Sequence, residues 1–335
     1  MTSKITRNAL LALIFLFTNT LSANNLEQTK EYINIIPQSR VVIDYGDLNK
    51  LSNKKQNIVL IYYALPNGNT IEWTAGKKME PLDDWHYDIQ HIKAQTSYIR
   101  ENDKNNYYVI AYLQAEKKAW TQHSTLHDSY KLYPQLVNNI EQIVNDSLKT
   151  IKQGLATNEL MLCSHSGGGR FMFDYISGNK EIPNKVTRLG FIDSNYGYED
   201  SLHTQKILNW LKAKKSHKFM LLSYVDTTVR LNGKPIVSKT GGTGYKTEEL
   251  YLCTNTKIKQ DKSASVRKNF TLHRVADTCF VRFSNKANNI IMRKKENPTG
   301  IIYHTVLVEK SGFIGFALWK DMWEEGKQAY AKYIK

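Results

Sequence analysis

Apolar runs alternate with stretches of helical spacing along most of the chain between residues 40 and 225. Continuous apolar, β-branched runs predict buried parallel strands, and apolar stripes with helical periodicity predict helices packed on them. The expected strands cover residues 40–45, 57–64, 107–113, 159–165, 186–193 and 219–225, and the expected helices cover 85–100, 130–153, 202–213 and a segment from 170 onward. This alternation predicts an α/β fold with a mostly parallel, doubly wound sheet.

The segment from about 230 to 275 departs from this pattern because it is rich in lysine and interrupted by glycines. Glycine runs such as Gly241-Gly-Thr-Gly244 cradle phosphates in some proteins, but no buried strand ends here and no lysine–serine pair follows. The sequence therefore favours a flexible loop. We expect an insertion or lid-like region within a single domain of residues 24–335, completed by apolar runs at 301–308 and 312–318 and a helix around 323–333.

The first 23 residues have the composition of an export signal. Lys4 and Arg7 precede an apolar run over residues 9–17, and small residues follow at Leu21-Ser-Ala23. The run is too short to span a bilayer, so it predicts a cleaved signal peptide. We expect a periplasmic or secreted protein without a transmembrane anchor after cleavage.

Charge and cysteine content add little to this picture. The formal charge of +15 is compatible with an anionic partner, but the lysines are scattered and no nucleic-acid motif accompanies them. We therefore expect no nucleic-acid partner. Cys163 is predicted to be a small buried residue, whereas an oxidising compartment would permit a disulfide between Cys253 and Cys279, which the sequence leaves open.

A short apolar run ends in a serine followed by three glycines, in Glu159-Leu-Met-Leu-Cys-Ser-His-Ser166-Gly-Gly-Gly-Arg170. A strand, a tight turn with serine at its apex and a helix form the nucleophile elbow of serine hydrolases. Gly168 supplies the small residue required two positions after Ser166, while Ser164 stands where a glycine is usual. The alternative frame, with Ser164 as nucleophile, places Leu162 and Ser166 at those positions and fits poorly.

A serine hydroxyl needs a base within hydrogen-bond reach and a carboxylate to orient that base. In this arrangement the histidine comes last in the chain, which favours His304, after the turn signal Asn297-Pro-Thr-Gly300. His273 is the competing base, although it lies in the irregular region. His165 adjoins the nucleophile and is expected to pack beside the elbow.

Two aspartates are candidates for the orienting acid, because each follows a predicted buried strand. Asp226 follows the strand at 219–225, and Asp193 ends the strand before it. Ligands and catalytic groups gather at the carboxyl ends of strands in open α/β sheets. Either carboxylate could instead cap a helix or turn, and the residues alone slightly favour Asp226.

The developing oxyanion needs preorganised N–H donors. One is expected from the backbone of Gly167, and others from the loop that follows the buried run at 57–64, which contains Asn67 and Gly68. An ordinary Pro-Asn-Gly turn is the competing interpretation of that loop.

A metal site is the weaker alternative for the chemistry. His123 and His127 are four residues apart, as on one helix face that binds zinc, with Asp128 beside them. No third ligand follows at a telling distance, so we predict neither a metal nor a cofactor.

Several short sequence motifs match one group of sequences, and together they span most of residues 57–316. They are Leu65-Pro-Asn-Gly-Asn-Thr-Ile-Glu-Trp-Thr74, Trp85-His-Tyr-Asp-Ile-Gln-His-Ile92 with Ala94-Gln95, Ser164-His-Ser-Gly-Gly168, Asp193-Ser-Asn-Tyr-Gly197, and Glu296-Asn-Pro298 leading to His304-Thr-Val-Leu-Val-Glu309. With them the chain resembles the α/β-hydrolase superfamily, and within it a poorly characterised group of exported bacterial proteins. Because the Asp-Ser-x-Tyr-Gly motif is characteristic of that group, the resemblance favours Asp193 over Asp226 as the acid.

The sequence thus predicts an exported serine hydrolase that acts through an acyl-enzyme, with Ser166, His304 and Asp193 as its triad. An ester is the expected substrate bond and an amide the alternative, in a small molecule or an acylated component of the cell envelope. The rival hypothesis is a non-catalytic binding protein of the envelope that keeps the same fold.

Overall fold

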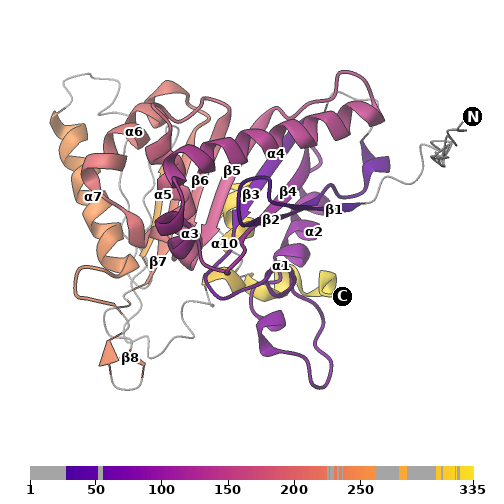
Figure 1. Ribbon diagram of the computed structural model, residues 1–335, viewed down its shortest axis with the longest axis horizontal. Coiled ribbons are helices and arrows are strands. Elements are labelled where there is room, and N and C mark those ends of the chain that lie inside the picture. Colours follow the sequence, from indigo (N-terminus) through magenta and orange to yellow (C-terminus); the bar gives the residue numbers. More distant parts are fainter. Residues whose placement is uncertain are drawn as a thin grey trace, which may run out of the picture.

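The computed structural model describes residues 28–51, 56–224, 226, 230–231, 234–235, 237–260, 279–284, 307–310, 312–320, 322 and 325–335. The predicted signal segment and both candidate bases, His273 and His304, lie outside the described residues. A central sheet with helices on both faces makes up most of the molecule (Figure 1).

The central sheet has eight strands in the order β1-β2-β4-β3-β5-β6-β7-β10. Their bounds are β1 (Thr29–Ile33), β2 (Ser39–Asp44), β3 (Asn57–Ala64), β4 (Asn106–Ala115), β5 (Glu159–His165), β6 (Val186–Ile192), β7 (Lys218–Ser223) and β10 (Cys279–Ser284). Neighbours from β4 to β7 pair in parallel, whereas β1, β2 and β10 join through antiparallel pairings. The predicted fold class is confirmed: this is a mostly parallel, doubly wound sheet of the α/β-hydrolase type.

Helices cover the two faces of the sheet and bury a separate apolar core on each. The first core includes residues of α3 (Trp120–Leu126), α4 (Ser129–Ile151), α5 (Gly169–Gly178), α6 (Asp200–Ala213) and α7 (Thr243–Gln260). The second core includes residues of α1 (Ile71–Ala75), α2 (Ile92–Asn102) and α10 (Gly312–Leu318). The sheet is therefore apolar on both sides, as its continuous hydrophobic strands require.

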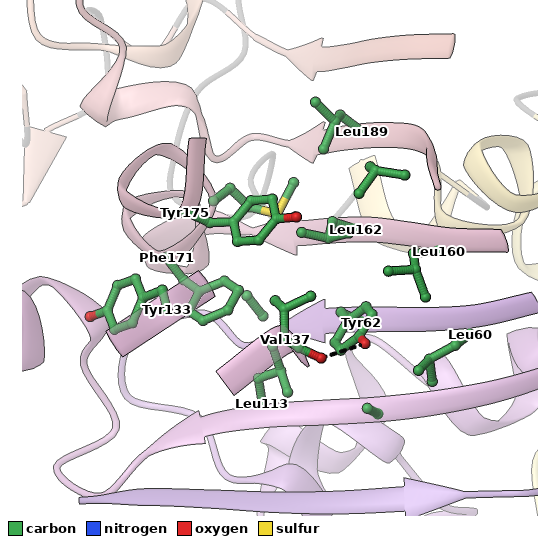
Figure 2. Close-up of a cluster of buried hydrophobic side chains, with 14 of the residues drawn as sticks. Leu60, Tyr62, Leu113, Tyr133, Val137, Leu160, Leu162, Phe171, Tyr175 and Leu189 are labelled. Atoms are coloured by element: carbon green, nitrogen blue, oxygen red, sulfur yellow. Dashed lines mark hydrogen bonds between the residues drawn. The ribbon is translucent and has the colours of Figure 1, made fainter. Parts of the chain in front are cut away.

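Strand β3 shows how one segment serves both cores. Leu60 and Tyr62 face the first core (Figure 2), while Ile61 belongs to the second, because successive side chains of a strand point to opposite faces. The Tyr62 hydroxyl donates a hydrogen bond of 2.9 Å to the backbone carbonyl of Val137 in α4. This bond satisfies a phenol that is otherwise enclosed by apolar side chains.

The helix expected over residues 85–100 is divided. A 3-10 turn, η2 (Trp85–Asp88), comes first, and α2 begins only at Ile92. His91 between them has a left-handed backbone with φ of 46°, which interrupts helical geometry, and its Nε2 lies 2.8 Å from Oδ1 of Asp88. The closing helix expected around 323–333 is likewise replaced, where described, by two 3-10 turns, η6 (Gly326–Ala329) and η7 (Ala331–Tyr333).

The segment expected as a lid-like insertion contains a short hairpin and a helix. Strands β8 (Arg230–Leu231) and β9 (Lys234–Pro235) pair with each other, and α7 packs against α6 and β7. Helix α7 begins at Thr243, so the expected flexible loop over 241–244 is wrong for its second half. Cys253 on α7 carries a free thiol, so the disulfide that the sequence left open is not formed at this residue. Within the described residues, no helix has both the length and the apolarity needed to cross a membrane.

Candidate active site

Ser166 lies at the apex of the turn between β5 and α5, in the 3-10 turn η3 (Ser166–Gly168). Its backbone φ is 49°, in the left-handed region that non-glycine residues rarely occupy. Such strain persists only where the surrounding structure enforces it, and it concentrates at functional sites. Ser166 is partly exposed, whereas residues 160–165 of β5, which precede it, are buried. This is the backbone geometry that a nucleophile elbow requires.

The glycines after Ser166 allow two neighbouring strands to approach the turn. A Cβ at Gly168 would lie 2.2 Å from the carbonyl oxygen of Ala64, at the end of β3. A Cβ at Gly169 would lie 1.4 Å from the carbonyl oxygen of Ser194, just after β6. Real Cβ atoms do not approach other atoms so closely, so both positions require glycine for packing alone.

The predicted oxyanion loop lies directly against the elbow. A Cβ added at Gly167 would lie 2.1 Å from Cγ of Asn67, so the Asn67 side chain rests on the Gly167 backbone. The Gly68 N–H donates to the backbone carbonyl of Lys118 at 2.7 Å, and it is therefore already engaged in this structure. Gly167 and Asn67 are the members of the predicted oxyanion site that the structure brings together.

Ser164 occupies the position where a nucleophile elbow usually has glycine, and the structure gives it a role. It is fully buried, and its Oγ lies 2.7 Å from Oγ of Ser194. The Ser194 hydroxyl also lies 3.3 Å from the carbonyl oxygen of Ser164. These contacts tie the end of β5 to the turn that follows β6, and they place Ser164 away from solvent.

Both candidate acids lie at the same sheet edge as the elbow. In the sheet register, His165 pairs with Ile192 and Ile192 pairs with Leu222, so β5, β6 and β7 end within one residue of one another at the same edge of the sheet. Asp193 follows β6 with φ of 46°, and Asp226 lies three residues beyond β7. Both are fully buried.

One threonine connects the two acids. The Thr243 hydroxyl, at the start of α7, donates to Oδ1 of Asp193, and the Thr243 N–H donates to Oδ2 of Asp226 at 2.8 Å. Oγ1 of Thr243 also lies 3.4 Å from Oδ2 of Asp226. The alternatives that the sequence left open are thus neighbours in one cluster.

Burial and mutual repulsion govern the electrostatics of this cluster. Burial raises the pKa of Asp226 to about 6, and the negative charge of Asp193 contributes in the same direction. Burial also raises the pKa values of Tyr196 and Tyr224, again with a contribution from both carboxylates. The two phenols are therefore neutral groups that face the acids.

A buried polar network holds α7 against the strand ends. Asn195 donates through Nδ2 to Oγ1 of Thr247 at 2.9 Å and to the carbonyl oxygen of Thr243 at 3.2 Å. Oγ of Ser223, the last residue of β7, lies 2.8 Å from the same Thr247 hydroxyl. Sequence reasoning missed Ser223, Thr243 and Thr247. Thr243 and Thr247 are four residues apart and so lie on one face of α7, and this spacing was the only signal for them in the sequence.

His165 turns away from the nucleophile, as expected. Its Nδ1 lies 3.1 Å from Oε1 of Gln90, which also accepts a hydrogen bond of 3.1 Å from the Tyr63 hydroxyl. This histidine therefore belongs to the packing on the second face of the sheet. His304, the predicted base, lies outside the described residues, so its approach to Ser166 stays a prediction.

The histidines of the weaker metal hypothesis are engaged by protein groups. Nδ1 of His123 lies 3.1 Å from the Tyr133 hydroxyl, and its Nε2 lies 2.8 Å from the carbonyl oxygen of Pro37. Nε2 of His127 lies 3.0 Å from Oε1 of Gln38. In the part of the chain that the structure describes, no group of three His, Cys, Asp or Glu side chains is arranged to hold a metal ion.

No family model and no curated protein matches the chain. Among solved structures it is similar to the siderophore hydrolase EstB from Aspergillus nidulans, with a TM-score of 0.43, 12% identity, and coverage of 89% of this chain and 96% of that one. A serine hydrolase involved in carbazole degradation, the CarC enzyme, gives a TM-score of 0.30 and 12% identity over 87% of this chain and 98% of that one. A putative acetyl xylan esterase from Bacteroides fragilis gives a TM-score of 0.28 and 14% identity, over 49% of this chain and 44% of that one. These likenesses are slight, and the fold assignment stands on the strand order of the sheet.

Proposed function

We propose that the protein is a serine hydrolase that cleaves an ester bond through an acyl-enzyme. The observation that carries this proposal is the left-handed backbone of Ser166 at a strand-to-helix turn, with φ of 49°. An inert Ser-Gly turn has no need of that strain, whereas a nucleophile elbow uses it to present the hydroxyl. The Asn67 loop beside Gly167 and the acids after β6 and β7 supply the remaining groups at the same edge.

Each group has a defined task in the proposed reaction. Ser166 attacks the substrate carbonyl while His304 takes its proton, and His304 then returns that proton to the leaving group. Asp193 orients the imidazole and stabilises its cation. The N–H of Gly167 and the Asn67 loop stabilise the oxyanion. Water repeats the same steps to release the acyl group, so the reaction needs no cofactor.

Asp226 remains the alternative acid, because Thr243 contacts both carboxylates. An amide is the alternative substrate bond. The predicted signal peptide and the basic composition favour an exported enzyme that acts on a small or envelope-derived acylated molecule. A binding protein of the envelope with the same fold is the competing function.

A fluorophosphonate probe tests the proposal directly, because it forms a covalent adduct only with an activated serine. We expect one adduct on the wild-type protein, located on Ser166 by peptide mass spectrometry, and none on Ser166→Ala. Ser164→Ala is the matched control: it removes the neighbouring serine of the rejected frame and should keep the adduct. An adduct that survives in Ser166→Ala contradicts the assignment, and a folded wild type without any adduct favours the binding protein.

The triad and the substrate bond need a second experiment. Ester, thioester and amide panels are compared on wild type, His304→Gln, Asp193→Asn and Asp226→Asn. We expect the largest loss of kcat at His304 and Asp193, and no effect of a chelator. Loss of activity in the chelator would instead indicate a metal-dependent enzyme.

A further inference from the structure

We propose that Asp193 and Asp226 act as a proton-sharing pair joined by Thr243, in which Asp226 holds a proton in weakly acidic solution while Asp193 carries the negative charge. In this arrangement Thr243 and Asp226 are positioning residues for Asp193. The catalytic consequence rests on the proposed function, whereas the shared proton itself does not.

The first support is the supply of hydrogen-bond donors to Asp226. Its Oδ2 accepts from the Thr243 N–H, but its Oδ1 is buried and has no partner among the described residues. Gly242 closes that side, since a Cβ there would lie 1.9 Å from Oδ1. A buried carboxylate oxygen without a donor is costly, and a protonated carboxyl avoids most of that cost.

The second support is the position of the Thr243 hydroxyl. It has a single proton, which it donates to Oδ1 of Asp193, and its oxygen lies 3.4 Å from Oδ2 of Asp226. A proton on that Oδ2 can be donated to Oγ1 of Thr243, which gives a chain from Asp226 through Thr243 to Asp193. With both acids ionised, the same hydroxyl would face two acceptors with one proton.

The electrostatic surroundings agree with this assignment. The groups that face the pair are Tyr196 from the turn after β6 and Tyr224 from the end of β7, and both are neutral. Burial and the charge of Asp193 raise the pKa of Asp226 to about 6, although the backbone N–H groups of Thr243, Asp226 and Gly244 favour its ionised form. Two adjacent carboxylates resist double ionisation for the same reason, which is their mutual repulsion at low dielectric.

A simple structural role gives a different expectation. The Asp226 carboxylate accepts from the first N–H of α7, so it could serve only as a cap for that helix. If Asp226 acts only as a cap, Asp226→Asn should lower the stability by a similar amount at every pH at which the acid is ionised. A shared proton instead makes the effect of Asp226→Asn change with pH.

The direction of the pH effect follows from the raised pKa. A group that holds its proton more tightly in the folded state stabilises the fold below its unfolded pKa, and that contribution is lost as the pH rises through the folded pKa. For Asp226 the window runs from the ordinary value of 3.8 to about 6. Asparagine resembles the protonated acid and does not titrate, so the variant should lack this loss.

The experiment measures urea unfolding at pH 5, 6.5 and 8 for wild type, Asp226→Asn, Thr243→Val and Thr243→Ser. We expect Asp226→Asn to gain stability relative to wild type between pH 5 and pH 8. Stability of Asp226→Asn that runs parallel to wild type across this range overturns the proposal and leaves the cap. If the variant fails to fold, a carboxyl carbon NMR titration of the wild type decides, since an Asp226 midpoint below pH 4.5 also overturns it.

Activity adds a readout that a merely structural residue would not change. Thr243→Val should lower kcat with little change in KM and shift the pH profile, and Thr243→Ser, which keeps the hydroxyl, should restore both. Thr247→Val is the matched control, because this threonine is equally buried on the same helix but contacts neither acid, and its pH profile should match wild type. A profile in Thr243→Val that matches wild type contradicts the positioning role.

The two proposals fail separately. Absence of the fluorophosphonate adduct refutes the serine hydrolase but leaves the pH dependence of unfolding intact. A pH-independent effect of Asp226→Asn refutes the shared proton but leaves the adduct on Ser166.

Discussion

Because the backbone at Ser166 is left-handed, we predict that the Ser166→Gly variant is more stable than the Ser166→Ala variant. A non-glycine residue in this conformation costs about 1–2 kcal/mol, which glycine avoids because it has no Cβ. Glycine also loses more backbone entropy on folding, about 0.5–1 kcal/mol. The balance at position 166, where φ is 49°, favours Ser166→Gly over Ser166→Ala by about 0.5–1 kcal/mol. Both variants lack the hydroxyl, so its contacts cancel from the comparison.

The matched control is the same pair of substitutions at Asn139, an exposed position within α4. In a helix interior, glycine is less stable than alanine by about 1 kcal/mol. The sign of the difference therefore reverses between the two positions. This reversal separates backbone strain from any general effect of adding glycine.

Urea unfolding of the four variants measures both differences, provided that the slope of free energy against urea is the same for each pair. Ser166→Gly that is less stable than Ser166→Ala, by an amount similar to that at Asn139, would refute the strained turn. The nucleophile elbow would then lose its main support.

Two further predictions concern packing. Gly168→Ala should lower the free energy of unfolding by about 1–3 kcal/mol and abolish the fluorophosphonate adduct, because its Cβ would lie 2.2 Å from the Ala64 carbonyl oxygen. Gly197→Ala is the control: the nearest neighbour of its Cβ would be at 3.4 Å, so its effect should stay within about 0.5 kcal/mol. Equal effects in thermal unfolding would contradict the close approach at Gly168. Tyr62→Phe should lower the free energy of unfolding in urea by about 1 kcal/mol through loss of the hydrogen bond to the Val137 carbonyl. Tyr112→Phe is its control and should be neutral or stabilising, because the buried Tyr112 hydroxyl has no partner among the described residues. If Tyr112→Phe lowers the free energy of unfolding as much as Tyr62→Phe does, the loss cannot be assigned to the Tyr62 hydrogen bond.

The central strands were predictable because their physical signal is local. Strand β3 is apolar along nearly its whole length, as a strand covered on both faces must be. Strand β1 was missed because it pairs only at the edge, and its residues alternate between exposed and half-buried. Helix α10 is buried over six of its seven residues, and a short apolar run of that kind does not distinguish a helix from a strand.

The candidate site divides in the same way. The elbow and the two strand-end acids were predictable, since Ser166, Asp193 and Asp226 each follow an apolar run. The connection between the acids was not, because Thr243 comes 50 residues after Asp193 in the chain and reaches it only through the docking of α7. The left-handed conformations of His91 and Asp193 were equally invisible, since both are imposed by their surroundings.

The three glycines after Ser166 affect how mutational data on this protein should be interpreted. Gly168 and Gly169 exclude any larger residue because a Cβ would meet backbone at the end of β3 and at the turn after β6, whereas at Gly167 it would meet only the exposed side chain of Asn67. A deep mutational scan selected only for abundance in the cell should therefore deplete substitutions at Gly168 and Gly169. Intolerance there reports folding rather than chemistry. A position where substitution spares abundance but removes turnover marks the reaction centre, and we expect this result at Ser166.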